Sequence, residues 1–386
     1  MKTKYLDIFL AFALVLIVVS GFAHTWQQAT TLANYVGSVG MSADGKIICA
    51  VPSASHVVIS ADSGKTWALA TNSPPPGTSL PGGVALSADG SKIFAVLNGN
   101  GTNRVFVSPD HGGTWIQTAF PGATNSFYPS CFIACSADGS KLVAATPYSP
   151  IYFSTNGGVD YSTSSAPKAP WSSVASSADG GLMIATASLG GVYFSGDFGA
   201  SWILTALPTS LWNSVCTSSD GKWIGATDGF GSYVSSDGGR TWLTNQISGN
   251  TIACSADGTN WLITGEDIYT STNGGTTWAT NVSGSLWRAG AVSADGSEMA
   301  ALGSEQGTWL GLATPSPRLN IQPQNSSLTI SWIIPSTNFV LQQSLDLTPL
   351  SWASVSPGPT LNFSNLQQQV TVPAIGNSTF FRLMAQ

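Results

Sequence analysis

Residues 171–202 read WSSVASSADGGLMIATASLGGVYFSGDFGASW, and this stretch decides the fold. It holds the motif Ser-Ala-Asp-Gly at 177–180 and the motif Ser-x-Asp-x-Gly-x-x-Trp at 195–202. Asp-Gly favours a tight hairpin turn, because glycine adopts positive φ without penalty and the aspartate side chain accepts backbone N–H groups. We therefore predict a first strand at 171–176, a second at 182–187, a third at 191–195 and a fourth beginning at Trp202.

Both motifs recur along most of the chain. The first occurs seven times, with its aspartates at Asp44, Asp89, Asp138, Asp179, Asp220, Asp257 and Asp295. The second follows each of the first six copies, at 60–67, 108–115, 154–161, 195–202, 235–242 and 271–278. The mean spacing of about 42 residues is typical of a four-stranded propeller blade.

The seventh unit is short of one strand. After Asp295 only the degenerate turn at 304–309 remains, whereas residues 25–30 near the N-terminus resemble residues 66–71, the outer strand of the first unit. We predict that the N-terminal strand completes the last blade, which closes the ring and removes an unpaired sheet edge.

These repeats resemble the Asp-box, or BNR-repeat, propellers, a superfamily that includes sialidases, xyloglucan-degrading enzymes and photosystem II assembly factors. The resemblance covers about residues 24–314. It implies an all-β fold, a seven-bladed β-propeller of four-stranded blades. It also implies that the Asp box is a structural turn away from the ligand-binding face, so the repeats do not identify the function.

The first 23 residues have the pattern of a secretory signal peptide. Two lysines precede the apolar stretch 8–19, and Gly21-Phe22-Ala23 ends in small residues. The alternative is an uncleaved anchor, but this stretch is shorter than the roughly 20 residues that span a bilayer. We expect a mature chain beginning near His24 and a secreted or cell-surface (periplasmic or extracellular) protein.

Pro315-Ser316-Pro317 marks a predicted boundary, and 315–386 is predicted to be a small β-sandwich. The predicted strands are 328–332, 338–343, 351–355, 368–372 and 380–384. They resemble a C-terminal fibronectin-III-like module. Its role is left open between a stabilising spacer and a surface-attachment or carbohydrate-binding module.

Composition excludes several functions. The net charge is -6, with 13 Lys+Arg against 19 Asp+Glu and no basic run, so we expect no nucleic-acid partner. The chain lacks a phosphate loop, which argues against a nucleotide, and no cofactor is expected. Its five cysteines form no Cys/His cluster, so we predict free, buried thiols and no metal site.

Catalytic candidates are few once the repeat aspartates are set aside. Asp228 and the pair Glu266-Asp267 occupy matching connections between second and third strands of neighbouring blades. They are the carboxylates that a glycosidase would most readily use, although solvated turn residues are the alternative. A sialidase is disfavoured, because its three carboxylate-binding arginines have no counterpart among Arg104, Arg240 and Arg288.

Aromatic residues suggest a binding site. Trp171, Trp212 and Trp287 each lie eight residues before the repeat aspartate, with Tyr35 and Tyr128 near the same register. One hypothesis is an aromatic rim at the channel, with Arg288 nearby, that stacks on sugars or anchors a peptide. The alternative is that these rings pack between blades.

We therefore expect a secreted, non-catalytic propeller for recognition or assembly, monomeric, that binds an extracellular glycan or an envelope protein at its channel face. The alternative is an exo-glycosidase of the sialidase superfamily, and a third possibility is a purely structural envelope protein. The sequence does not choose the ligand.

Overall fold

The computed structural model is all-β within the residues it describes. These residues are 24–29, 36–52, 56–70, 72, 82–99, 102–121, 130–284, 286–303, 307–312, 319–324, 327–333, 339–345, 352–363, 366–373 and 379–385. The predicted signal segment 1–23 and the predicted boundary at Pro315-Ser316-Pro317 lie outside them. None of the described segments forms a helix long and apolar enough to cross a membrane.

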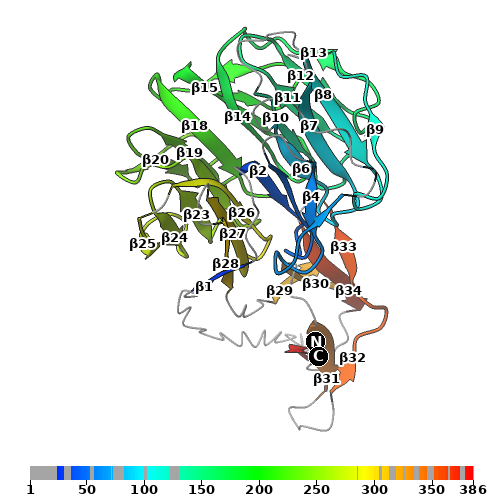
Figure 1. Cartoon of the computed structure of the whole chain (residues 1–386). Coiled ribbons are helices and arrows are strands. Elements are labelled where there is room, and N and C mark those ends of the chain that lie inside the picture. The colour runs from blue at the N-terminus through cyan, green and yellow to red at the C-terminus, as the bar shows by residue number, and fades with distance from the viewer. Residues whose placement is uncertain are drawn as a thin grey trace, which may run out of the picture.

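Seven antiparallel four-stranded units follow one another along the chain (Figure 1). Blades 1 to 3 consist of β2 (Val36–Met41), β3 (Ile48–Pro52), β4 (Val58–Ser60) and β5 (Ala68–Leu69); β6 (Val84–Leu86), β7 (Ile93–Gly99), β8 (Thr102–Ser108) and β9 (Ile116–Gln117); and β10 (Phe132–Cys135), β11 (Leu142–Ala145), β12 (Ile151–Ser154) and β13 (Ser162–Thr163). Blades 4 and 5 consist of β14 (Trp171–Ser176), β15 (Met183–Gly190), β16 (Val192–Ser195) and β17 (Ile203–Leu204); and β18 (Ser210–Thr217), β19 (Ile224–Asp228), β20 (Ser232–Ser235) and β21 (Leu243–Asn245). Blades 6 and 7 consist of β22 (Thr251–Cys254), β23 (Trp261–Thr264), β24 (Ile268–Ser271) and β25 (Ala279–Val282); and β26 (Trp287–Val292), β27 (Glu298–Gly303), β28 (Gly307–Leu312) and β1 (Thr25–Gln28).

The units close into a ring at the Ser-Ala-Asp-Gly turns. In each turn the residue before the aspartate donates its backbone N–H to the carbonyl of the same residue in the next blade, at 2.7 to 2.9 Å. The seven residues are Ala43, Ala88, Ala137, Ala178, Ser219, Ala256 and Ala294, and Ala294 donates back to Ala43. We call them the alanine ring. The chain is therefore an all-β propeller, as predicted.

Blade 7 combines both ends of the propeller sequence. Strand β1 pairs antiparallel with β28, with Thr25 opposite Leu312 and Gln28 opposite Trp309. A Cβ on Gly311 would lie 2.8 Å from the indole of Trp26, so the glycine lets the two strands approach closely. This pairing covers the edge of β28.

The Ser-x-Asp-x-Gly-x-x-Trp turns are held by a repeated set of hydrogen bonds. In blade 4 the Ser195 hydroxyl donates to Asp197 (2.8 Å) and accepts the Gly199 N–H (2.9 Å), while Trp202 Nε1 donates to the Gly199 carbonyl (2.9 Å). The hydroxyl and backbone N–H of Ser201 both donate to the Asp197 carboxylate and lower its pKa. These aspartates serve as turn anchors.

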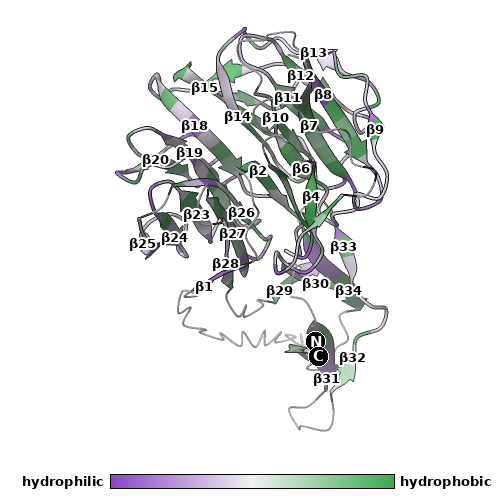
Figure 2. Cartoon of the chain, in the orientation of Figure 1, coloured by the Kyte–Doolittle hydropathy of each residue, from purple (hydrophilic) through white to green (hydrophobic). Residues whose placement is uncertain are grey.

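The core lies between neighbouring blades. The second strands are almost fully buried on both faces and apolar, as Ile224, Ala226 and their equivalents show. Figure 2 shows the hydrophobic residues gathered along strands such as β4 and β7. Each blade therefore buries both faces against the blades beside it, and the ring must be complete to cover them all.

The C-terminal segment forms two sheets. One has the order β29 (Asn320–Gln324), β30 (Ser327–Ile333), β34 (Gln367–Pro373) and β33 (Thr360–Asn362), and the other has the order β32 (Ala353–Ser354), β31 (Phe339–Ser344) and β35 (Phe380–Ala385). Ile330, Trp332 and Val370 from the first sheet pack with Leu341 from the second in one buried cluster. Strands β29 and β33 were not predicted from the sequence. Pro323 obscured β29, and a proline is tolerated there because β29 is an edge strand.

This C-terminal module contacts the propeller at the alanine ring. Ile333 from the end of β30 and Leu366 from the turn before β34 pack against the ring. Figure 1 shows β29, β30, β33 and β34 on one side of the propeller. The turns between first and second strands, and the Ser-x-Asp turns, therefore belong to a face that the module partly covers. We call it the Asp-Gly face and the opposite one the open face.

Candidate functional site

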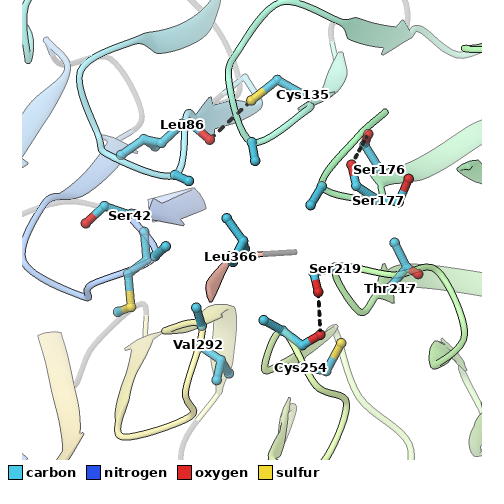
Figure 3. Close-up of a pocket in the computed structure, with 17 residues that line it drawn as sticks. Ser42, Leu86, Cys135, Ser176, Ser177, Thr217, Ser219, Cys254, Val292 and Leu366 are labelled. Carbon is cyan, nitrogen blue, oxygen red and sulfur yellow. Dashed lines mark hydrogen bonds between the residues drawn. The ribbon is translucent and has the colours of Figure 1, made fainter. Parts of the chain in front are cut away.

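The channel contains a cavity just inside the Asp-Gly face (Figure 3). It has a volume of about 170 Å³, and Leu366 of the C-terminal module lies at its centre in the view. Besides the alanine ring, the inner strands contribute one side chain each, from Met41, Leu86, Cys135, Ser176, Thr217, Cys254 and Val292. The cavity is smaller than the roughly 300 Å³ at which small-molecule sites begin.

The chemistry of the cavity is that of small apolar and hydroxyl side chains. Its two thiols are not activated: burial raises the pKa of Cys135 to about 12, and its Sγ donates to the Leu86 carbonyl at 3.2 Å. A hydrogen bond with Cys216 and burial raise the pKa of Cys254 well above its ordinary value. Thiols of this kind are poor nucleophiles, so the cavity has no evident catalytic group.

The predicted aromatic rim is not present at the three tryptophans. Trp171, Trp212 and Trp287 are among the largest fully buried side chains and pack between blades. The Trp171 indole donates to the Ser149 carbonyl at 3.0 Å, and Trp212 lies 4.9 Å from the ring of Tyr233. The expectation of exposed stacking rings was wrong for these residues, and the packing alternative describes them correctly.

A β-bulge explains this placement. In blades 1, 4, 5 and 7 the pairing register between the first and second strands shifts directly after the residue that lies eight positions before the repeat aspartate. In blade 5 this shift lies between Trp212 and Ser214. The bulge leaves the residue eight positions before the aspartate in the core and changes the direction of the side chain that follows it. Asn213, at the bulge of blade 5, is exposed and donates to the Gly249 carbonyl at 3.1 Å, and Asn250 donates to the Trp287 carbonyl at 2.7 Å. Polar side chains thus line the open face near the channel.

Asp228 is buried, and its carboxylate is occupied by a turn. One oxygen accepts the backbone N–H groups of Phe230 (2.8 Å) and Gly231 (2.7 Å), and the other accepts the Ser210 hydroxyl at 2.6 Å. The side chain is 1% exposed. This geometry is that of an anchor for the β19–β20 turn and differs from the accessible carboxylate that a glycosidase requires.

Glu266 and Asp267 lie at the equivalent turn of blade 6, between β23 and β24. Asp267 accepts hydrogen bonds from the Tyr269 hydroxyl and the Gly284 N–H, both at 3.0 Å, so it also ties neighbouring segments together. Glu266 is exposed. Of the three carboxylates proposed for catalysis, Glu266 is exposed, Asp267 is half-buried and Asp228 is buried.

The remaining predicted binding residues divide into two groups. Arg288 lies in β26 at the bulge and is half-buried, at the open-face end of the inner strand. Tyr35 and Tyr128 lie outside the described residues. All five cysteines are unbridged, and the described residues contain no group of three or more potential metal ligands.

Sequence reasoning missed a partly buried titratable cluster where blade 7 meets blade 1. Burial raises the pKa of both Asp295 and Glu298, and each has one buried carboxylate oxygen for which no hydrogen bond is found. His24 lies beside them, its Nε2 2.8 Å from the Gly296 carbonyl, and burial lowers its pKa. The only sequence signal was the carboxylate three residues after the last repeat aspartate, where no other copy has one. The cluster lies on the Asp-Gly face, at the ring closure.

The fold and the site geometry together define a propeller with one partly covered face and one open face. No protein-family profile matches the sequence, and none of the curated proteins compared with it is similar. Solved structures do share the fold. YCF48 bound to a D1 peptide is 16% identical over 76% of this chain and 97% of its own, with a TM-score of 0.56. YCF48 from Cyanidioschyzon merolae is 16% identical over 75% and 98%, with a TM-score of 0.52.

A third similar structure is an enzyme. The GH74 enzyme from Niastella koreensis is 12% identical with a TM-score of 0.60, over 87% of this chain and 60% of its own. At these identities the similarity shows a shared fold alone. It gives no evidence that this chain binds a peptide or hydrolyses a sugar.

Proposed function

We propose that this protein is an exported, non-catalytic propeller that recognises or assembles a partner protein through its open face. The observation that carries the proposal is the position of Leu366, which occupies the Asp-Gly mouth of the channel and leaves the open face as the accessible one. On that face the described polar groups serve to hold turns and connect blades.

A protein partner is favoured over a glycan for two reasons. The tryptophans that would have stacked on sugar rings are buried between blades, so the main sugar-binding feature is absent at those positions. A structurally similar propeller, YCF48, has been solved with a peptide bound. An exposed sugar-binding site elsewhere on the open face would contradict this preference.

A glycoside hydrolase is the competing function, and the likeness to a GH74 enzyme is the observation in its favour. A canonical glycosidase needs two carboxyl groups facing one substrate, about 5 to 9.5 Å apart. Asp228 is buried, and both oxygens of half-buried Asp267 accept hydrogen bonds, so neither offers Glu266 an unengaged carboxylate partner. Loss of sugar release in Glu266→Gln would restore this hypothesis.

The test incubates the purified protein with an array of polysaccharides, oligosaccharides and immobilised peptides, and measures both retained protein and released sugar. The proposal expects retention on peptides without released sugar. Released reducing sugar that depends on Glu266 would overturn the proposal that the protein is non-catalytic. Retention on glycans alone would overturn the choice of a protein partner. Detection of the processed chain outside the cytoplasm, by fractionation, tests the export.

A further inference from the structure

The open face carries large apolar side chains on three successive blades. Tyr148 lies between β11 and β12, Leu189 near the end of β15 and Phe230 in the β19–β20 turn, which are equivalent turns of blades 3, 4 and 5. Their side chains are 49%, 74% and 73% exposed. Leu211, at the start of β18, is exposed to 40%. We call these four residues the apolar ridge.

The ridge is contiguous in blades 4 and 5. Strand β15 continues beyond its own blade and pairs with β18, Ser188 opposite Leu211, so the bulged Leu189 lies beside Leu211. A Cβ on Gly229 would lie 3.8 Å from the Cβ of Leu211, which places Leu211 against the turn that carries Phe230. Blades 4 and 5 thus form one continuous sheet with the ridge at its end.

Backbone strain at two residues and a dedicated hydrogen-bonded anchor at a third accompany the exposure of the ridge. Tyr148 and Leu189 have φ values of 61° and 55°, a left-handed conformation that bulky side chains rarely adopt because it is strained. The buried carboxylate of Asp228 fixes the turn of Phe230 through two backbone N–H groups, and Ser210 connects that turn to β18. Strain and a dedicated anchor that both expose apolar side chains point to a binding surface.

We propose that the apolar ridge is the docking surface for an extended apolar segment of the partner protein; this inference rests on the proposed function and names its site. The charged residues at the two ends of the ridge favour this kind of occupant. Exposed Lys168 adjoins the Tyr148 turn, because Tyr148 donates its N–H to the Ala169 carbonyl (2.7 Å), and exposed Glu266 occupies the equivalent turn of blade 6, beyond Phe230. A segment with an acidic residue at one end and a basic residue at the other complements these two ends.

Two other occupants fit less well. An anionic membrane attracts clusters of lysine and arginine, whereas this chain has a net charge of -6. A second copy would bury only four partly exposed side chains at the ridge, which falls well short of the ~800 Å² per partner of a standard interface. A peptide needs a smaller surface, with a few anchoring side chains.

The test pans random dodecapeptides displayed on phage against the full chain, then measures the affinity of the selected peptides, made synthetically, by fluorescence anisotropy. The ridge variant is Leu189→Asn with Phe230→Ser. The control is Leu69→Ser with Ile116→Ser, two apolar residues that are 63% and 58% exposed on the outer strands β5 and β9, away from the ridge. We expect peptides with an apolar centre, at least about tenfold weaker binding to the ridge variant and unchanged binding to the control.

A stability measurement separates a binding role from a structural one. Asparagine tolerates the left-handed region better than leucine, so Leu189→Asn alone should keep or raise the melting temperature while it weakens binding. Equal binding to the ridge variant and the wild type would refute the ridge but leave the proposed function intact. Failure to select any peptide would refute the ridge as a peptide site. If the wild type sediments as a dimer and the ridge variant as a monomer, the occupant of the ridge is a second copy of this chain and the peptide proposal is refuted.

Discussion

Substitution of Asp228 distinguishes a turn anchor from a catalytic carboxylate. Asp228→Ala would leave the Phe230 and Gly231 N–H groups and the Ser210 hydroxyl without their acceptor in a buried site. An unsatisfied buried donor costs about 1–3 kcal/mol, so we expect a loss of roughly 3–5 kcal/mol in the free energy of unfolding. Asp228→Asn keeps one acceptor oxygen and should lose roughly 1–2 kcal/mol, because it gives up charge-assisted bonds only.

The assay is thermal unfolding at pH 7, followed by calorimetry. At about 2 °C per kcal/mol for a large domain, the alanine variant should melt roughly 6–10 °C below the wild type and the asparagine variant a few degrees below. Glu266→Gln is the matched control, since an exposed carboxylate should change stability by less than about 0.5 kcal/mol. If both Asp228 variants melt within about 1 °C of the wild type, the anchor role is refuted. Sugar release lost at unchanged stability would make Asp228 catalytic.

Four other changes test the fold. Trp212→Ala should cost about 3–5 kcal/mol, because it empties a fully buried site between blades; wild-type stability in urea with lost ligand binding would instead support a rim role. Trp26→Ala should expose the edge of β28 and promote aggregation, measurable by light scattering. Leu366→Asp should release the C-terminal module, and a separate calorimetric transition should appear. Burial raises the pKa of Asp295, so the folded protein binds the proton more tightly than the unfolded chain, and stability is lost as the pH rises through that raised pKa. Asp295→Asn removes the charge and should therefore increase the free energy of unfolding at pH 7, measured by urea titration.

The strand pattern and turns could be predicted because both depend on local chemistry. Strand β14 has the predicted bounds, Trp171–Ser176, since the Asp-Gly turn at 179–180 follows directly after it. The second strand of that unit was predicted to end at 187 but continues to Gly190, because β15 gains a partner in β18 of the next blade. Pairing between blades is not encoded in the spacing within one repeat, so the extension could not be predicted.

The candidate site was predicted less well, and one bulge accounts for most of the difference. Strict alternation along β18 would give Trp212 and Ser214 the same face of the sheet, whereas Ser214 faces blade 6, where its hydroxyl accepts the Ile252 N–H at 3.2 Å. The register shift between them instead leaves Trp212 in the core and Asn213 exposed. A bulge depends on the paired strand, and no residue type in this sequence marks it. The contact of Leu366 with the alanine ring could not be predicted either, because Leu366 lies in a turn of the C-terminal module and belongs to no repeat.

Residues other than glycine adopt positive φ on both faces of the propeller, and on the Asp-Gly face these are Ser63, His111 and Phe198 in the Ser-x-Asp turns. The open face differs in that two bulky, exposed residues of adjoining blades adopt it. On the Asp-Gly face each repeat turn has a glycine in the left-handed region, such as Gly180 at 71°, where it adds no steric cost. At the open-face turns of blades 3 and 4 the same region is occupied by Tyr148 and Leu189, both exposed. A turn that served stability alone would gain from glycine or asparagine at these positions. Because strain and exposed apolar surface both oppose stability and solubility, their coincidence on adjoining blades is best explained by contact with a partner.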